Sequence, residues 1–186
     1  MRRKFVVILA VTAVAGCLLN PVDAAAKKRA RPVTMTQFLN WGGDCAGSGY
    51  LALSHVPNPD SCALYFPELG NEHYFAGSQG MPFALDADQA VTVDFDLSSV
   101  VTAAAEFEAR LSATVGDEQV DVATGTVAIQ AARGSTPVHF DLEPAAELDN
   151  AKVSGLSLTI TWTEGVTYSS IDLDSGTAQM VVHGVK

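Results

Sequence analysis

Cysteine, basic residues and long apolar runs are all scarce in this chain of 186 residues, and each scarcity excludes a class of protein. Its 3 Cys are too few for a small scaffold built on disulfides. With 11 Lys and Arg against 21 Asp and Glu, the net charge is −10. This charge argues against unaided binding to nucleic acid or to an anionic membrane, since both need a basic face. A hydrophobic content of 48% excludes a disordered protein, and the length fits a single domain.

The N-terminus has the layout of a secretory signal peptide. Basic residues at positions 2–4 precede an apolar run over residues 5–19, which is shorter than the ~20 residues of a transmembrane helix. Val22 and Ala24 are small or aliphatic residues placed as a signal peptidase requires for cleavage before Ala25. We therefore expect a signal peptide over residues 1–24 and a secreted, extracellular protein without a transmembrane segment.

A second maturation route competes with the first. Residues 14–17, Val-Ala-Gly-Cys, resemble a bacterial lipobox, in which the cysteine is lipidated and becomes the mature N-terminus. Leu18 and Leu19 continue the apolar run, whereas a lipoprotein turns polar after its cysteine. Soluble secretion is therefore favoured, and a lipid anchor on Cys17 is the alternative.

Either route leaves Cys45 and Cys62 as the only cysteine pair of the mature chain. Because exported proteins mature in an oxidising compartment, we expect a disulfide between them. Closing a loop of this size stabilises a fold by ~3 kcal/mol in the chain-entropy model. Two free thiols, or one thiol used as a nucleophile, are the alternative.

Charge and composition divide the mature chain. Residues 25–33 form a basic linker, whereas the chain from Val33 onward has 20 acidic and four basic residues. The linker is interpreted as a solvated spacer, with attachment to an anionic envelope as the alternative. Residues 34–186 are expected to form one domain.

The first part of that domain, residues 34–83, is rich in aromatic residues, glycine and proline. Short strands are expected around Tyr50–Ser54 and Ala63–Phe66, with a turn at residues 57–60 between them. Five rings are the candidate ligand-binding residues, because aromatic faces stack on sugars or anchor a protein partner: Trp41, Tyr50, Tyr65, Tyr74 and Phe75. The alternative is that these rings pack beneath the loops as a local core.

From residue 84 onward the sequence reads with period two. Apolar residues alternate with polar ones over residues 91–97, 106–115, 120–129, 138–142 and 156–162, and Trp162 falls on an apolar face. Residues 168–173 and 178–183 flank Asp-Ser-Gly, which is typical of a hairpin. Only residues 98–105 and 144–150 suit a helical turn. Such alternation predicts an all-β protein, an antiparallel β-sandwich whose two sheets bury one face each.

Eight to ten strands fit a jelly roll better than a seven-stranded immunoglobulin domain, whose Cys-Trp-Cys spacing is absent. The pattern resembles a galactose-binding-like jelly roll, which is common among exported carbohydrate-binding modules. The resemblance lies in the strand pattern alone, so no functional residue is carried over from it.

Acidic residues that recur two apart raise two kinds of chemistry. Asp172 and Asp174, beside a predicted turn, are the candidate calcium ligands, although the third acid and the downstream Glu of a calcium loop are missing. A solvated acidic face is the alternative, and no other cofactor is expected. Paired acids also raise glycoside hydrolysis. None of the four histidines has the spacing of a metal site, and His73 beside Tyr74 is the most suggestive of them.

These observations favour an exported, non-catalytic module that binds an extracellular glycan, an envelope component or a protein through residues 38–83. A secreted interaction or inhibitor protein that presents the loop Pro57–Asp60 is the second hypothesis. A small hydrolase that uses dispersed acids is the third. The sequence leaves the ligand and the oligomeric state open.

Overall fold

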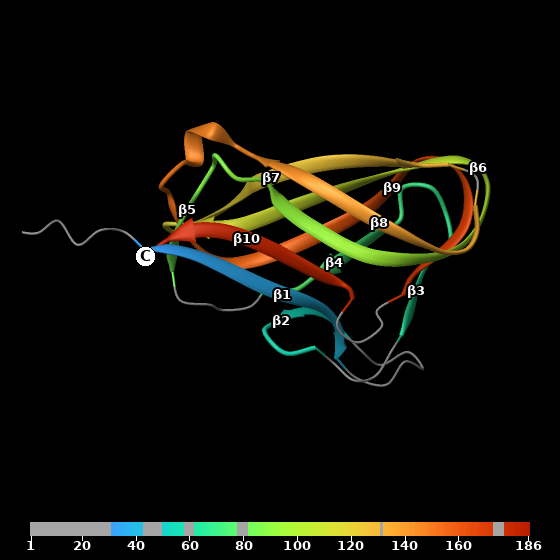
Figure 1. Cartoon of the computed structure of the whole chain (residues 1–186), viewed down its shortest axis with the longest axis horizontal. Helices are drawn as coiled ribbons and strands as arrows, with labels where there is room; N and C mark the ends of the chain where they lie inside the picture. Colours follow the sequence, from blue (N-terminus) through green and yellow to red (C-terminus); the bar gives the residue numbers. More distant parts are fainter. Residues whose placement is uncertain (1–30, 43–49, 58–61, 78–81, 131, 173–176) are drawn as a thin grey trace, which may run out of the picture.

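The computed structural model describes residues 31–42, 50–57, 62–77, 82–130, 132–172 and 177–186 (Figure 1). Within them lie strands that pair antiparallel, which confirms the all-β antiparallel prediction. The elements are β1 (Pro32–Gly42), β2 (Tyr50–Ser54), β3 (Ala63–Phe66), β4 (Glu72–Phe75), β5 (Phe83–Leu85), β6 (Val91–Val115), β7 (Glu118–Ile129), β8 (Ala132–Pro144), the 3-10 helix η1 (Ala146–Leu148), β9 (Lys152–Asp172) and β10 (Gln179–Val185).

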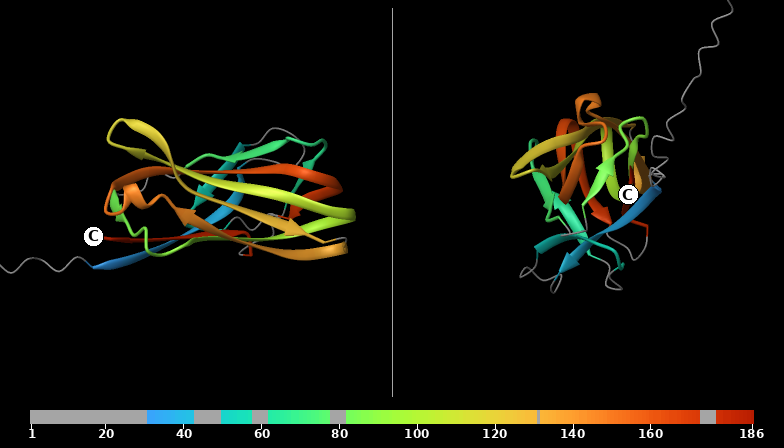
Figure 2. Two further views of the ribbon diagram at one scale, coloured as in Figure 1. Left: turned by 90° about the horizontal axis from the view of Figure 1, so that it is seen from above. Right: turned by 90° about the vertical axis from the view of Figure 1, so that its left-hand side faces the viewer.

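The strands β6 and β9 are long enough to belong to both layers of the sandwich. Residues 91–101 of β6 pair with β8, whereas residues 105–115 pair with β7. β9 follows β6 along both parts, with a register shift between the two. Both strands curve together at one end of the molecule, on the right in Figure 1. One continuous sheet therefore supplies both layers, which are seen end-on in Figure 2.

A glycine makes the bend of β9 possible. Gly165 lies opposite Ala105 of β6 and has a φ of 92°. A Cβ atom at this position would lie 2.1 Å from the carbonyl oxygen of Ala104. Since only glycine has no Cβ and tolerates this backbone conformation, the sequence permits the close approach of the two strands here.

The core lies between the layers, and the period-two pattern predicts most of it. Trp162 is 6% exposed, which confirms its predicted place in the core. On β9 the polar residues Ser157 and Thr159 are buried too, contrary to the simple alternation. Ser157 accepts a hydrogen bond of 3.1 Å from Gln119 Nε2, so its polar group is satisfied by a neighbouring side chain. Along β6 the inward side chains are Val91, Val93, Phe95, Leu97, Ala105, Phe107, Ala109, Leu111 and Ala113.

One of the two predicted helical turns is wrong. Residues 98–105 belong to β6, whose backbone pairs with β8 and β9 through this stretch. The apolar-polar alternation lapses there because the strand is crossing from one layer to the other. The other prediction is confirmed, since η1 lies within residues 144–150.

The predicted hairpin around residues 174–176 is also wrong. Asp172 pairs with Asp96 of β6, and Gln179 pairs with Asp94, so β10 continues along β6 in the direction of β9. On its other side β10 pairs with β1. Residues 173–176, which include Asp-Ser-Gly, lie outside the described part of the chain.

Near the N-terminus, β1 begins at Pro32, so the last residues of the predicted basic linker pair with the end of β10. In the part of the chain that the structure describes, no helix has the length and apolar character needed to cross a membrane.

Candidate functional site

A pocket opens where the pairing of β1 passes from β10 to β2. β1 pairs with β10 up to Phe38, and from Phe38 to Gly42 it pairs instead with β2. β3 pairs with residues 169–172 of β9, and β4 pairs with residues 158–161 of the same strand. The pocket between them has a volume of about 340 Å³, and its lining comes from all four strands and the residue before β3: Trp41, Leu51, Cys62, Ala63, Leu64, Tyr65 and His73. Small-molecule sites start at roughly 300 Å³.

Strand geometry places Trp41 and Leu51 on the same side of the pocket. They are direct cross-strand partners in the β1–β2 ladder, and opposite residues of an antiparallel pair project to the same face. Trp41 is half-buried and packs against the hydrophobic core, whereas Tyr65 on β3 is 59% exposed. One ring is therefore fixed by the core, and the other lies at the mouth of the pocket.

His73 is the polar residue of the pocket with the most defined contacts. Its Nε2 atom lies 3.0 Å from the carbonyl oxygen of Tyr65, and its ring meets Phe66 edge-on at 4.5 Å between centroids. Because a carbonyl oxygen only accepts, Nε2 carries the proton and donates it. Desolvation by burial lowers the pKa of His73 below its ordinary value, and the hydrogen bond to Tyr65 opposes this only in part. The ring is therefore neutral at pH 7, with Nδ1 as a hydrogen-bond acceptor.

The five rings predicted to bind a ligand do not form one platform. Trp41 and Tyr65 line the pocket together. Tyr50 and Tyr74 are 68% and 53% exposed and are not among the lining residues. Phe75 is 0% exposed, so its prediction as a ligand-binding residue is wrong. Alternation along β4 explains this, because Phe75 faces the core and its neighbour Tyr74 must then face solvent.

Leu51 and His73 line the pocket although the sequence did not mark them as ligand-binding residues. Alternation is the signal that finds His73, since it lies two residues from the buried Phe75 on β4. No signal in the sequence marks Leu51 apart from other strand leucines.

Three other predicted features fall partly or wholly outside the described residues. Cys62 is buried and is not a free thiol, but Cys45 is not described, so their pairing stays a prediction. Asp174 and the side chain of Asp172 are not described either, so the calcium prediction is untested. The predicted loop Pro57–Asp60 is described only at Pro57. Its base is held by Asn40, whose Nδ2 donates to the carbonyl of Val56 at 2.8 Å.

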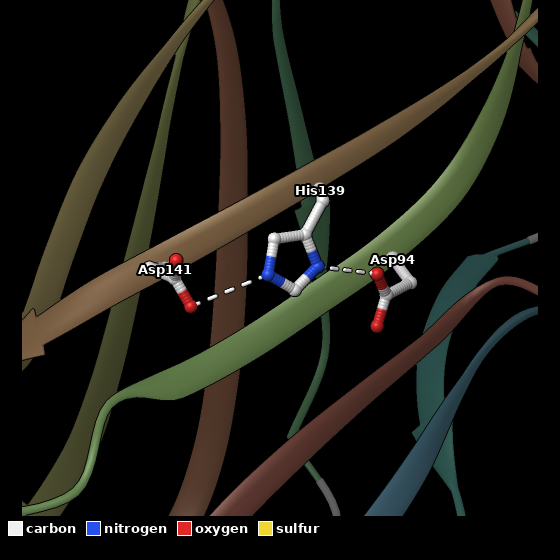
Figure 3. A network of polar contacts seen from close by, with 3 residues as sticks. All are labelled: Asp94, His139 and Asp141. Atoms are coloured by element: carbon white, nitrogen blue, oxygen red, sulfur yellow. Dashed lines mark hydrogen bonds and ion pairs between the residues drawn. The ribbon is translucent and has the colours of Figure 1, made fainter.

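A second histidine contacts two carboxylates on the outer face of β6 and β8 (Figure 3). His139 Nδ1 lies 2.6 Å from Asp94 Oδ1, and Nε2 lies 3.3 Å from Asp141 Oδ1. The hydrogen bond with Asp94 is the main cause that raises the pKa of His139. All three side chains are well exposed, at 55%, 38% and 68%. This network is therefore accessible to solvent.

An acidic concave surface adjoins this network between β6, β7 and β8. Its volume is about 530 Å³, and its lining residues are Glu108, Thr124, Gly125, Thr126, Asp141 and Glu143. Among the described residues, no three or more His, Cys, Asp or Glu side chains gather closely enough to hold a metal ion. The aromatic pocket is the stronger candidate site, because its rings and its histidine converge from separate strands.

No protein family model matches the chain, and no curated protein matches it. Among solved structures, it is similar to one described as infectious bursal disease virus Gt strain, at 12% identity and a TM-score of 0.48. That match covers 82% of this chain but only 32% of the viral chain, so this chain spans about a third of its length.

It is also similar to two carbohydrate-binding modules. One is described as specific for non-crystalline cellulose, with 17% identity, a TM-score of 0.36 and coverage of 80% of this chain and 78% of that one. The other is a family 11 module from Clostridium thermocellum in complex with a β-1,3-1,4-mixed-linked tetrasaccharide, with 9% identity, a TM-score of 0.37 and coverage of 81% and 87%. Likenesses this distant say nothing of the ligand, so any functional conclusion rests on the pocket itself.

Proposed function

We propose that this protein is a non-catalytic β-sandwich module that binds carbohydrate in the pocket of Trp41, Tyr65 and His73. The observation that carries the proposal is the convergence of two aromatic rings, from β1 and β3, on one cavity of about 340 Å³. Aromatic faces supply apolar area for the C–H faces of a sugar ring, and Trp and Tyr add a polar group at the edge. We also propose that the strands of the sandwich have a jelly-roll arrangement.

The lining of the pocket supports binding rather than hydrolysis. Glycoside hydrolases need two carboxyl groups about 5–10 Å apart across the bond to be cleaved. None of the described residues that line this pocket is an Asp or a Glu. Among these described residues, a sugar held between Trp41 and Tyr65 would therefore meet hydrogen-bonding groups but no acid-base pair.

Export is the second part of the proposal. The leader over residues 1–24 supports it, since its basic start, apolar run and small residues have the order of a signal peptide. An extracellular module of this kind meets glycans of cell surfaces or of the surrounding medium. Lipidation at Cys17 would instead hold the module at the membrane that exports it.

Substitution of the two pocket rings tests the binding site. The mature protein is run through gels that contain soluble neutral polysaccharides, among them hydroxyethylcellulose, mixed-linkage β-glucan, xylan and galactan. Trp41→Ala and Tyr65→Ala should each weaken retardation by at least tenfold in affinity, which is about 1.4 kcal/mol. Binding should also shift the fluorescence of Trp41, because the second tryptophan, Trp162, is buried in the core.

Tyr50→Ala and Tyr74→Ala are the matched controls, because both rings are exposed and neither lines the pocket. They should leave the affinity unchanged, and circular dichroism verifies that all four variants are folded. If no polysaccharide binds, or if the control variants lose affinity as much as the pocket variants do, the proposed function is wrong.

A further inference from the structure

The strands that build the pocket come from a part of the chain without permanent positive charge. Residues 34–83 contain no Lys or Arg, whereas they include four acidic residues: Asp44, Asp60, Glu68 and Glu72. In the rest of the domain the basic residues are Arg110, Arg133, Lys152 and Lys186, and none of them lines the pocket. Among the described residues that line the pocket, a protonated His73 is therefore the only possible side-chain cation.

The surroundings of His73 favour its neutral form. β3 contributes Tyr65, and Cys62 precedes that strand; β1 and β2 contribute the non-ionisable Trp41 and Leu51. On β9 the backbone partner of His73 is Ile160, between two threonines, and on β4 itself Glu72 lies on the opposite face. No charged side chain contributes to the lowering of the pKa of His73, which is due to desolvation.

The polar atom that His73 can offer a ligand is Nδ1. Its Nε2 proton is donated to the carbonyl oxygen of Tyr65, and the contact with Phe66 fixes the plane of the ring. Within the described residues, Nδ1 has no hydrogen-bond partner. An uncharged acceptor beside two aromatic rings suits a hydroxyl group, which has a proton to donate.

We infer that the pocket selects an uncharged sugar unit that donates a hydroxyl hydrogen bond to Nδ1 of His73, and that protonation of His73 releases the sugar. This inference rests on the proposed function and adds the class of ligand and the pH dependence of its release. A uronic acid or a sulfated sugar would bring an anion into a pocket whose described lining has no permanent cation to pair it. When His73 takes up a proton at low pH, Nδ1 no longer accepts the hydroxyl proton. A bound sugar would also have to bury the charged ring, and burial already disfavours the charged form of His73.

Charge selectivity is tested with two forms of one polymer. The probe is a neutral polysaccharide that retards the wild-type protein, such as hydroxyethylcellulose, compared with its carboxymethylated counterpart at pH 7 and at low and high salt. At high salt, the general repulsion between the acidic protein and the carboxymethylated polymer is screened. Under that condition we still expect the neutral polymer to bind at least tenfold more tightly than the carboxymethylated one. Equal or tighter binding of the carboxymethylated polymer would overturn the inference while leaving the proposed function intact.

The pH dependence of binding tests the role of His73. Wild-type affinity for the neutral polymer should fall roughly tenfold between pH 7 and pH 4, because only the neutral ring accepts a hydrogen bond. His73→Gln keeps an acceptor and does not titrate, so its binding should be independent of pH in this range. His73→Phe keeps an aromatic ring beside Phe66 but no acceptor, and should bind at least tenfold more weakly at pH 7.

His139→Gln is the matched control, since it removes an exposed histidine that is not among the lining residues of the pocket. It should retain the wild-type pH profile. If His73→Gln also retains that profile, His73 does not control release and the inference is wrong. If no neutral or charged polysaccharide binds to any variant, the proposed function itself fails.

A measurement without ligand keeps the inference testable if a variant does not fold. In the free wild-type protein, ¹⁵N NMR of the imidazole should show His73 neutral at pH 7 and protonated on Nε2. A charged ring at pH 7, or a proton on Nδ1, would remove the acceptor and overturn the inference.

Discussion

His73 on β4 and His139 on β8 have opposite electrostatic environments. His73 is half-buried against Phe66, and desolvation lowers its pKa. His139 is exposed between Asp94 and Asp141, and the hydrogen bond with Asp94 is the largest of the effects that raise its pKa. The difference arises from the face of the strand on which each lies: one points toward the pocket, the other toward solvent and a row of acids.

The contact between His139 and Asp94 makes stability depend weakly on pH. Because the pKa of His139 is raised in the folded protein, its protonated form stabilises the fold. That stabilisation is complete below the ordinary histidine pKa and is lost as pH rises through the raised value. It should be small, since the three side chains are well exposed. Asp94→Asn should lower the pKa of His139 toward its ordinary value, as measured by NMR titration.

Asp96→Asn is the control for this prediction. Asp96 lies two residues from Asp94 on the same face of β6, but it does not contribute to the raised pKa of His139. It should leave the titration of His139 almost unchanged. Equal effects of the two variants would show that the general acidity of the surface, and not the hydrogen bond, raises the pKa.

At the residue scale, composition predicted the neighbourhood of the candidate site better than its members. The aromatic residues of 34–83 drew attention to this segment, and Trp41 and Tyr65 do line one pocket. Tyr74 and Phe75 are adjacent on a strand, so one had to face inward, but which one depends on the register of β4 with β9. Composition holds no information on that register, and for the same reason His73 was missed as a lining residue.

At the scale of the strand, alternation predicted where strands lie but not how they connect. Residues 91–97 and 106–115 have the pattern of two strands, yet they are the two parts of β6. Asp-Ser-Gly after residue 173 has the chemistry of a hairpin, yet β10 continues the line of β9 along β6. Turn residues indicate that a strand is interrupted, whereas the partner of the next segment is decided by contacts distant in sequence.

Gly165, at the bend of β9, should tolerate substitution poorly. Gly165→Ala should destabilise the protein by roughly 3 kcal/mol or more, because strain at positive φ adds to a clash with the backbone. The Cβ atom would lie 2.1 Å from the Ala104 carbonyl oxygen and 2.7 Å from the Cα of Ala105. Neither backbone atom can yield without separating β9 from β6. Urea denaturation followed by circular dichroism measures the loss.

Gly134 on β8 offers a matched control for this bend. Its φ of 93° is almost that of Gly165, but a Cβ atom there would meet nothing within 4 Å. Gly134→Ala should therefore cost only the backbone strain, about 1–2 kcal/mol. If the two substitutions cost the same, the close approach of β9 to β6 does not limit the sequence at residue 165.

At the scale of the whole molecule, the pocket is a consequence of how the sheet is shared. β10 follows β9 along β6, so β1 and β3 both lie beside the same line of strand. Between them β1 turns away to pair with β2, and Ala52 of β2 bridges to Ala76 after β4. The candidate site thus lies where β3, beside β9, is followed by β1, beside β10. The acidic residues of β6 and β8 line a different concave surface.

The maturation of the chain bears on this edge, because Cys62 borders the pocket. We expect the exported protein to begin at Ala25 and to weigh about 2 Da less than its reduced form, since a disulfide between Cys45 and Cys62 removes two hydrogens. Intact mass spectrometry of the native protein, with and without reduction, measures both quantities.

The disulfide should also stabilise the fold. Cys45→Ser should lower the free energy of unfolding by ~3 kcal/mol, and reduced wild-type protein should show the same loss. A mass with a lipid on Cys17 would establish the membrane-anchored form instead, and equal masses before and after reduction would exclude the disulfide. In that case the contacts of β3 with β9 would have to hold the Cys62 side of the pocket without a covalent link.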